Sequence, residues 1–193
     1  MKKPIALFFV FLLLLCLSII QPIKAQTLEN IFINPDGSVT GTSSIQRNGN
    51  NYTLKGNILG NIQVQKNNIV IDGAGYTIQG NGTGTGFDLS NGSGGDPSRA
   101  INNITITNLE IVNFGTGVYT ANSKNNVFHR NYIANCDCGL LLMGSQNNRI
   151  TSNTFENNLN AISIDYCKGE ASVITENNLI NNDIIVWVRK RLK

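Results

Sequence analysis

Residues 103–165 decide the fold: NITITNLEIVNFGTGVYTANSK (103–124) is followed by NNVFHRNYIANCDCGLLLMGSQ (125–146) and NNRITSNTFENNLNAISID (147–165). When these segments are aligned at a 22-residue period, apolar residues fall on apolar residues and Asn falls on Asn. Self-similarity at a fixed period indicates a repeat architecture in which each repeat is one structural unit. The aligned columns include Asn103/Asn125/Asn147, Ile106/Phe128/Ile150, Ile111/Ile133/Phe155, Asn113/Asn135/Asn157 and Val118/Leu140/Ile162.

The repeat continues in both directions with two interruptions. After Asp165 the step lengthens by two positions in every column at once, which a single two-residue insertion between positions 167 and 172 explains. An earlier copy at residues 69–89 is displaced by about ten residues, which we place in the Gly-, Pro- and Ser-rich loop 91–99. Residues 52–64 form an imperfect first copy, so we expect about five to six repeats.

Each repeat contains three short runs in which apolar residues occupy alternate positions, the pattern of β-strands with one buried face. Asn- and Gly-rich corners separate the runs. Because equivalent residues recur in the same order and direction, the strands of successive repeats should pair in parallel, about 4.8 Å apart. The sequence therefore predicts an all-β chain that folds as a parallel β-helix of about five to six coils with a 22-residue period.

The Asn columns are expected to form ladders along the corners. An Asn side chain can bond to the coils above and below, and Asn tolerates the left-handed backbone that tight corners need. The expected ladders are Asn113, Asn135, Asn157 and Asn181 in one column and Asn103, Asn125 and Asn147 in a second.

The segment NIVIDGAGYTIQG (68–80) and the copies that begin at residues 103, 125 and 147 resemble a known family. They are similar to right-handed parallel β-helix proteins of the pectin-lyase-like superfamily, in particular NosD-like and carbohydrate-binding or sugar-hydrolase repeat proteins. The resemblance covers roughly residues 58–188 and implies a right-handed coil, in agreement with the general preference of parallel connections. It leaves the activity open, because such repeats serve lyases, hydrolases, copper accessory proteins and non-enzymatic surface proteins alike.

The segment 1–25 is typical of a secretory signal. Two lysines precede the apolar run 5–20, and Ala25 suits cleavage. The alternative is an uncleaved N-terminal anchor, since about sixteen apolar residues fall just short of the roughly 20 that span a bilayer. We therefore expect a secreted, cell-surface or periplasmic protein that contacts a membrane only through this segment. Without it, basic and acidic residues are equal in number, so the charge does not indicate nucleic-acid binding.

Function is expected on the outward-facing positions. One outward column contains Asp88, Tyr119 and Trp187. Aromatic rings stack well against sugar rings, so this column is a candidate site for a polysaccharide or surface glycan; the alternative is that these are ordinary solvent-facing residues. His129 lies in a second outward column with Arg149 nearby, and both are further candidates for ligand binding.

Catalysis is disfavoured because the acidic residues do not align between repeats. Elimination with calcium needs several carboxylates and a strong base. Inverting hydrolysis needs two carboxylates about 6.5–9.5 Å apart. Non-enzymatic carbohydrate recognition is therefore the favoured function, and a polysaccharide lyase or glycoside hydrolase is the alternative.

Soft metal ligands gather in neighbouring repeats. They are His129, Cys136, Cys138 and Met143. The NosD-like resemblance implies a periplasmic copper accessory protein as a third alternative. Cys and Met in such places more often fill core and corner positions, and we expect no cofactor.

The ends of a coil stack need caps, because each end exposes strand edges and apolar core. Residues 26–57 are expected to form the N-terminal cap and first strands, 58–188 the β-helix, and 189–193 a basic tail. The tail is too short to cover the last coil. Three explanations are open, in order of preference: the reading frame is truncated, a second chain covers the edge, or the basic charges discourage pairing of the edge strands. The second explanation predicts end-to-end self-association.

Overall fold

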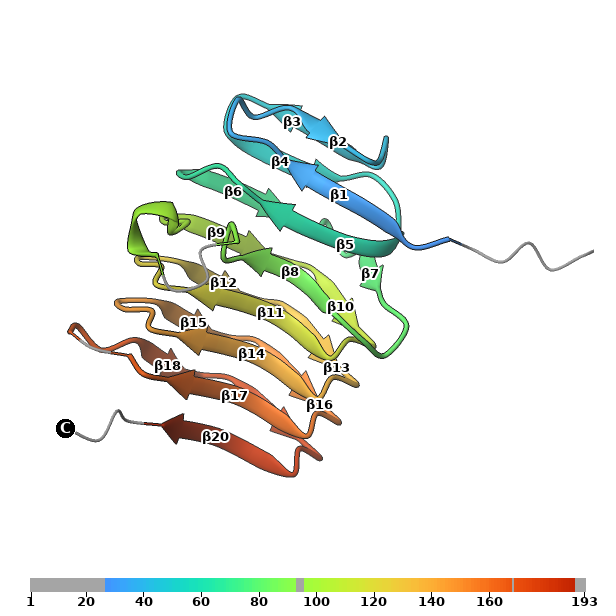
Figure 1. Cartoon of the computed structure of the whole chain (residues 1–193). Coiled ribbons are helices and arrows are strands. Elements are labelled where there is room, and N and C mark those ends of the chain that lie inside the picture. Colours follow the sequence, from blue (N-terminus) through green and yellow to red (C-terminus); the bar gives the residue numbers. More distant parts are fainter. Residues whose placement is uncertain (1–26, 93–95, 168, 190–193) are drawn as a thin grey trace, which may run out of the picture.

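The computed structural model describes residues 27–92, 96–167 and 169–189. In this part of the chain nearly all regular structure is β-strand, and the strands wind into a coil whose turns stack along one axis (Figure 1). The expected signal, residues 1–25, lies outside the described residues, as do residues 190–193 of the expected tail. No helix in the described segments is long and apolar enough to cross a bilayer.

Each coil contributes one strand to each of three faces, which we call sheets A, B and C. Sheet A contains β5 (Ile58–Val64), β8 (Thr85–Leu89), β11 (Thr116–Ala121), β14 (Cys138–Met143), β17 (Asn160–Asp165) and β20 (Ile184–Arg189). Sheet B contains β4 (Asn51–Leu54), β6 (Ile69–Asp72), β9 (Ile104–Thr107), β12 (Val127–His129), β15 (Arg149–Thr151) and β18 (Val173–Thr175). Sheet C contains β7 (Thr77–Gln79), β10 (Glu110–Val112), β13 (Tyr132–Ala134), β16 (Thr154–Glu156) and β19 (Asn178–Ile180). Sheets A and C join at β5, which pairs with both β7 and β8.

Neighbouring coils pair in parallel with the predicted register. Val118 pairs with Leu140 and Leu140 with Ile162, as the 22-residue period requires. Ile162 then pairs with Val186, the step that is longer by two positions. The prediction of an all-β chain in a parallel β-helix of about five to six coils is therefore confirmed.

The earlier coil is longer, as the sequence indicated. Asp88 pairs with Tyr119, so the chain between them exceeds the regular period. The extra residues lie mainly between β8 and β9, where the short 3-10 helix η1 (Pro97–Arg99) is found. Asp96 caps η1 by accepting a hydrogen bond from the Ser98 N–H, and its hydrogen bonds with Ser98 lower the pKa of the Asp96 carboxyl.

Apolar side chains stacked in columns fill the interior of the coil. The fully buried columns are Ile62/Phe87/Val118/Leu140/Ile162 in sheet A, Ile71/Ile106/Phe128/Ile150 in sheet B and Ile78/Ile111/Ile133/Phe155 in sheet C. Each such side chain contributes about 1.5–3 kcal/mol by burial. The repeat therefore folds because every coil covers the apolar surface of its neighbours.

At the corner between sheets C and A, one of the two expected Asn ladders is not formed. Asn113, Asn135, Asn157 and Asn181 all have positive φ, from 50 to 64°. Asn113 donates to the Gly80 carbonyl at 3.0 Å. Within the described segments, however, no hydrogen bond joins these four side chains to one another. The column supplies the left-handed backbone of the corner and not a side-chain ladder.

The ladder at this corner is made by the next residue along the chain, which points inward. Asn158 Oδ1 accepts from the Cys136 N–H at 3.0 Å, and its Nδ2 donates to the Ile133 carbonyl at 3.0 Å. Asn182 repeats this arrangement one coil later, since its Oδ1 accepts from the Asn158 N–H. An Asn-Asn pair thus divides two tasks: the first residue turns the chain and the second bonds to the coil before it.

The other expected column forms a ladder on the outside. Asn125 donates to Asn103 at 3.1 Å, and Asn147 donates to Asn125 at 2.8 Å. The ladder extends one coil further, because Asn103 donates to Asn68 at 2.8 Å. All four residues have positive φ.

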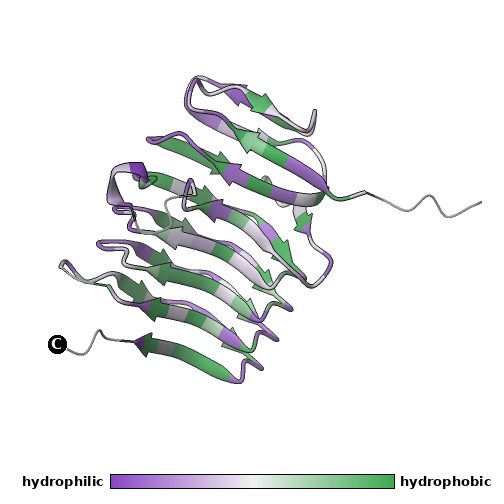
Figure 2. Ribbon diagram, viewed as in Figure 1, coloured by the Kyte–Doolittle hydropathy of each residue, from purple (hydrophilic) through white to green (hydrophobic). Residues whose placement is uncertain are grey.

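The N-terminal end is closed by antiparallel strands. β1 (Glu29–Ile33) pairs in parallel with β5 and antiparallel with β2 (Val39–Thr40). β3 (Ile45–Asn48) pairs antiparallel with β4. At the other end β18, β19 and β20 are the last strands of their sheets, and β20 is hydrophobic along most of its length (Figure 2).

Candidate functional site

One row of outward side chains runs from β1 across β5, β8, β11, β14 and β17 of sheet A. Backbone pairing places these residues on neighbouring strands: Phe32, Gln63, Asp88, Tyr119, Leu141 and Ser163. We call this set the outward row. The backbone of Trp187 pairs with that of Ser163, and the Trp187 side chain lies outside the described part. The row brings the sequence candidates Asp88 and Tyr119 side by side, because parallel pairing without slippage keeps one face of every strand outward.

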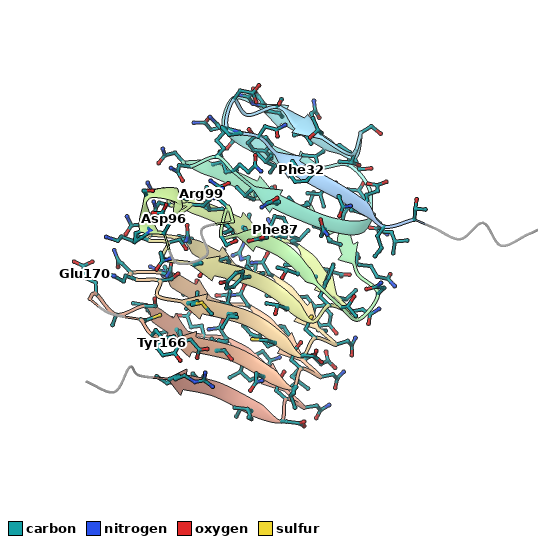
Figure 3. All side chains as sticks on the ribbon, in the orientation of Figure 1. Phe32, Phe87, Asp96, Arg99, Tyr166 and Glu170 are labelled. Carbon is teal, nitrogen blue, oxygen red and sulfur yellow. The ribbon has the colours of Figure 1, made fainter. Side chains whose placement is uncertain are left out.

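A hollow of about 280 Å³ lies at the N-terminal end of the row. Its lining comes from β1, β5 and β8: Asn30, Phe32, Asn61, Ile62, Gln63, Thr85 and Asp88. Figure 3 marks Phe32 on β1, in the N-terminal cap, and Phe87 on β8. Phe32 is half-buried, whereas Phe87 is fully buried in the core. The hollow therefore offers one accessible aromatic ring among polar groups.

The polar groups of the hollow are held in place by neighbours. Asn61 Nδ2 donates to Asn30 Oδ1 at 3.1 Å. Asp88 Oδ1 accepts from the Ser90 N–H at 2.7 Å. The second Asp88 oxygen makes no hydrogen bond to any described residue, so the carboxylate keeps acceptor positions for a ligand.

Tyr119 continues the row beside Asp88. Its hydroxyl donates to Met143 Sδ at 3.4 Å. Partial burial, and secondarily the charge of Asp88, raise the pKa of Tyr119. The phenol is therefore neutral at physiological pH and presents a fixed ring, which is suited to packing and not to proton transfer.

The remaining ligand-binding candidates lie on a different face. His129 ends β12 and Arg149 begins β15, both in sheet B. His129 Nδ1 is 3.2 Å from both the carbonyl and the hydroxyl oxygen of Thr151, so a structural contact already engages this ring. The five sequence candidates therefore do not form one site: Asp88, Tyr119 and the Trp187 backbone share sheet A, and His129 and Arg149 share sheet B.

The four metal-ligand candidates are not brought together either. His129 is on sheet B, whereas Cys138 and Met143 are the ends of β14 in sheet A. Cys136 is buried at the corner, where its thiol donates to the Ala134 carbonyl at 3.3 Å. In residues 27–92, 96–167 and 169–189, no group of three or more His, Cys, Asp or Glu side chains is placed to hold a metal ion. Parallel stacking explains the separation, since residues on different faces of a coil stay on different faces of the helix.

Burial also lowers the reactivity of the cysteines. Desolvation is the main cause that raises the pKa of Cys136 to about 11. Burial likewise raises the pKa of Cys138 and that of Cys167. All three are free thiols. A thiol with a raised pKa is a weak nucleophile and a poor metal ligand at neutral pH.

Sheet C carries two hydrogen-bonded acidic side chains, Glu110 on β10 and Glu156 on β16, with β13 between their strands. Thr77 Oγ1 donates to Glu110 at 2.8 Å, and the Tyr132 hydroxyl donates to Glu156 at 2.9 Å. The hydrogen bond to Glu156 is the main cause that raises the pKa of Tyr132. Both carboxylates are thus engaged in cross-strand contacts.

Of the residues that line the hollow, only Asp88 was predicted from the sequence. Phe32, Gln63 and Asp88 follow one another in the outward row, but neither of the two intervals between them equals the 22-residue period. A search at that period does not align them. The alternation in β5, where Asn61 and Gln63 lie outward between buried apolar residues, is the signal that reveals them.

The fold agrees with a comparison against protein families. The family model described as "right handed beta helix region" matches residues 31–191. No curated protein matches the chain significantly, and no solved structure does. Because the model covers most of the chain and supplies the right-handed winding expected from the sequence, the chain belongs to the right-handed β-helix family.

Proposed function

We propose that this chain is a non-enzymatic recognition scaffold that binds carbohydrate along the outward row of sheet A. The observation that carries the proposal is the hollow between β1, β5 and β8, where Phe32 lies beside the amides of Asn30, Asn61 and Gln63 and the carboxylate of Asp88. Sugars present apolar C–H faces and a rim of hydroxyl groups. A site with an aromatic ring and a few fixed polar groups offers partners for both.

The outward row has a shape that suits the binding of an extended glycan chain. Successive coils repeat at about 4.8 Å, so outward side chains are spaced at nearly regular intervals along the helix axis. Phe32 lies at one end of this part of the row and Tyr119 at the other, with Gln63 and Asp88 between them. A glycan that runs along the axis would contact both rings and hydrogen-bond between them.

The composition of the hollow supports binding over cleavage. Most glycoside hydrolases use two carboxyl groups, one on each side of the bond that breaks. Asp88 is the one carboxylate among the residues that line the hollow. The carboxylates of Glu110 and Glu156 lie on sheet C, on strands that β13 separates, and accept hydrogen bonds from Thr77 and Tyr132.

An extracellular or periplasmic location belongs to the same proposal. The expected signal at residues 1–25 supports export, and surface glycans are met outside the cytoplasm. Detection of the mature chain in the medium, periplasm or cell-wall fraction checks this part. The mature N-terminus should begin near residue 26.

Binding is tested with residues 26–193 on a glycan array, followed by calorimetric titration of the hits. We expect Phe32→Ala and Tyr119→Ala each to weaken binding by about tenfold, because each removes a stacking contact. Tyr132→Ala is the matched control, since it removes an outward Tyr from sheet C, and it should leave the affinity unchanged. Array binding by neither the wild type nor any variant, or equal loss in all three variants, would contradict the proposal.

The enzymatic alternative is tested with the same glycans. Incubation followed by assays for new reducing ends and for unsaturated products should show no turnover. Turnover that is lost in Asp88→Asn would replace the binding proposal with an enzymatic one.

A further inference from the structure

We infer that the glycan bound by the outward row is a neutral oligosaccharide and not an acidic polysaccharide. This inference rests on the proposed function and names the chemistry of its ligand. It starts from the charges that face the row, because acidic polysaccharides carry a carboxylate or sulfate on most of their units.

The hollow carries a negative charge without a positive one. Its lining consists of three amides, one hydroxyl, two apolar side chains and the Asp88 carboxylate. The row continues with Tyr119, Leu141 and Ser163, none of which is charged. From Phe32 to Ser163 the described row has no lysine, arginine or histidine.

The other charged residues of β1 and sheet A do not change this balance. Glu29 at the start of β1 and Asp165 at the end of β17 are both acidic. Arg189, the one described cation of sheet A, lies at the end of β20, where its backbone pairs with that of Asp165 on the last coil, far from the hollow. Arg47 is held in the cap, where its Nε donates to the Gly49 carbonyl and its guanidinium lies 6.0 Å from the ring centre of Tyr52. A uronate in the hollow would meet Asp88 without a counter-charge.

The hydrogen-bonding capacity of the row points the same way. The Asp88 carboxylate only accepts hydrogen bonds, and the Ser90 N–H already fixes one of its oxygens. It therefore selects a ligand that donates. The hydroxyl groups of a neutral sugar donate and accept, whereas the carboxylate of a uronate only accepts. The amides of Asn30, Asn61 and Gln63 suit hydroxyl groups for the same reason, since each amide both donates and accepts.

The distance between Phe32 and Tyr119 along the outward row sets the size of the ligand. Phe32, Gln63, Asp88 and Tyr119 occupy four neighbouring strands, so the two rings lie roughly 14 Å apart along the axis. A single sugar does not reach both rings. The structure therefore assigns the row to a short neutral oligosaccharide segment.

The test is calorimetric titration of residues 26–193 with cellohexaose, xylohexaose, mannohexaose and hexagalacturonate. We expect at least one neutral hexaose to bind at least tenfold more tightly than hexagalacturonate at low salt. Neutral binding should change less than twofold at high salt, because no ion pair is formed.

Two charge-matched variants sharpen the result. Asp88→Asn keeps the shape of the side chain, so we expect it to weaken neutral binding by about tenfold and to reduce the discrimination against hexagalacturonate. Glu110→Gln makes the same change in net charge on sheet C and should alter neither. Circular dichroism of each variant checks that the fold is kept.

The outcomes separate the two proposals. Hexagalacturonate that binds more tightly than every neutral hexaose, and loses this preference at high salt, would overturn the present inference and leave carbohydrate recognition standing. If none of the four oligosaccharides and no glycan on the array binds, the proposed function fails and this inference fails with it.

Discussion

The two ends of the coil stack differ although the same kind of coil lies behind each. At the N-terminal end Ile31, Ile33 and Tyr52 are fully buried, and the Tyr52 hydroxyl donates to the Gly37 carbonyl at 2.8 Å. At the C-terminal end Val186 and Val188 are 40% and 55% exposed, although they continue columns that are buried in earlier coils. The difference shows that a coil is buried by its neighbours and not by its own sequence.

The N-terminal cap works by changing the direction of the chain. β1 still pairs in parallel with β5, but β2 and β3 run antiparallel to their partners, so the parallel register ends there. The same β1 that covers the core with Ile31 and Ile33 turns Phe32 outward into the hollow. The cap therefore builds one wall of the proposed binding site, and damage to the cap should affect both stability and binding.

The largest effect is expected at the capped end. Tyr52→Ala should lower the free energy of unfolding by about 3–5 kcal/mol, because it removes a fully buried aromatic ring and leaves a cavity. Val186→Ala, at the open end, should cost less than about 1 kcal/mol, since the side chain already contacts solvent. Urea denaturation followed by circular dichroism measures both.

Tyr52→Phe is the control within this comparison. It keeps the ring and removes the hydrogen bond to Gly37, so a loss of about 1 kcal/mol is expected. Equal costs for Tyr52→Ala and Val186→Ala would show that the two ends of the stack are equally well covered.

A second comparison follows one column from the middle of the stack to its last coil. Asn153 is buried, and its Oδ1 accepts from the Asn131 N–H at 2.9 Å. Its Nδ2 donates to the Phe128 carbonyl at 2.8 Å. Asn153→Ala should cost about 3 kcal/mol, because it leaves these backbone groups buried without partners.

Asn177, one coil later in the same column, is only half-buried. It accepts from the Asn153 N–H and donates to the Ile150 carbonyl. Asn177→Ala should cost about 1 kcal/mol, since water can reach the groups that it frees. The same denaturation series measures the pair, and a cost for Asn177→Ala as large as that for Asn153→Ala would refute the dependence on position.

These residues also show how far the sequence predicted the fold. The 22-residue period set the register from residue 103 onward, because parallel stacking places equal residues on equal residues. It pointed to the wrong Asn of the pairs 157–158 and 181–182, because the first member recurs as Asn113 and Asn135 whereas the second is replaced by Phe114 and Cys136 in those coils. The outer column at Asn113, Asn135, Asn157 and Asn181 was therefore expected to carry bonds that Asn158 and Asn182 make.

The candidate site was less predictable for a related reason. Asp88 and Tyr119 were found because their strands belong to the recognisable repeat. Phe32 lies in the cap, where antiparallel pairing replaces the repeat and no period links it to Gln63. Periodicity predicts the body of a solenoid well and says little about its ends, and this site is built at an end.

Ionisation of Cys136 is expected to make the free energy of unfolding depend on pH, with a smaller effect than the substitutions above. The pKa of Cys136 is about 11 in the folded chain, against an ordinary value of 9.0. Above pH 9 the unfolded chain loses the thiol proton first, so Cys136 should lower the stability by about 2 kcal/mol as the pH rises from 9 to 11. The measurement is urea denaturation at several pH values, with Cys136→Ala as the variant in which this part of the pH dependence is absent.

Thiol labelling of the folded protein at pH 8 compares the accessibility of a cysteine inside the stack with that of one near its open end. Cys136 is buried, whereas Cys167 lies near the open end and is half-buried. We expect Cys167 to be labelled first and Cys136 only as the protein unfolds. Rapid labelling of Cys136 under native conditions would contradict the burial that raises its pKa.

The smallest effect on unfolding is expected from Val188→Lys, within about 0.5 kcal/mol at protein concentrations low enough to keep the chain monomeric, because the side chain is more than half exposed. The same variant tests the prediction of end-to-end self-association. Antiparallel strands close the N-terminal end, so a second copy would have to meet the apolar end with its own apolar end, which gives a closed dimer and not a filament. Size-exclusion chromatography with light scattering should then find a dimer for the wild type and a monomer for Val188→Lys. A wild type that remains a monodisperse monomer at high concentration would show that the exposed valines of β20 do not pair with a second copy.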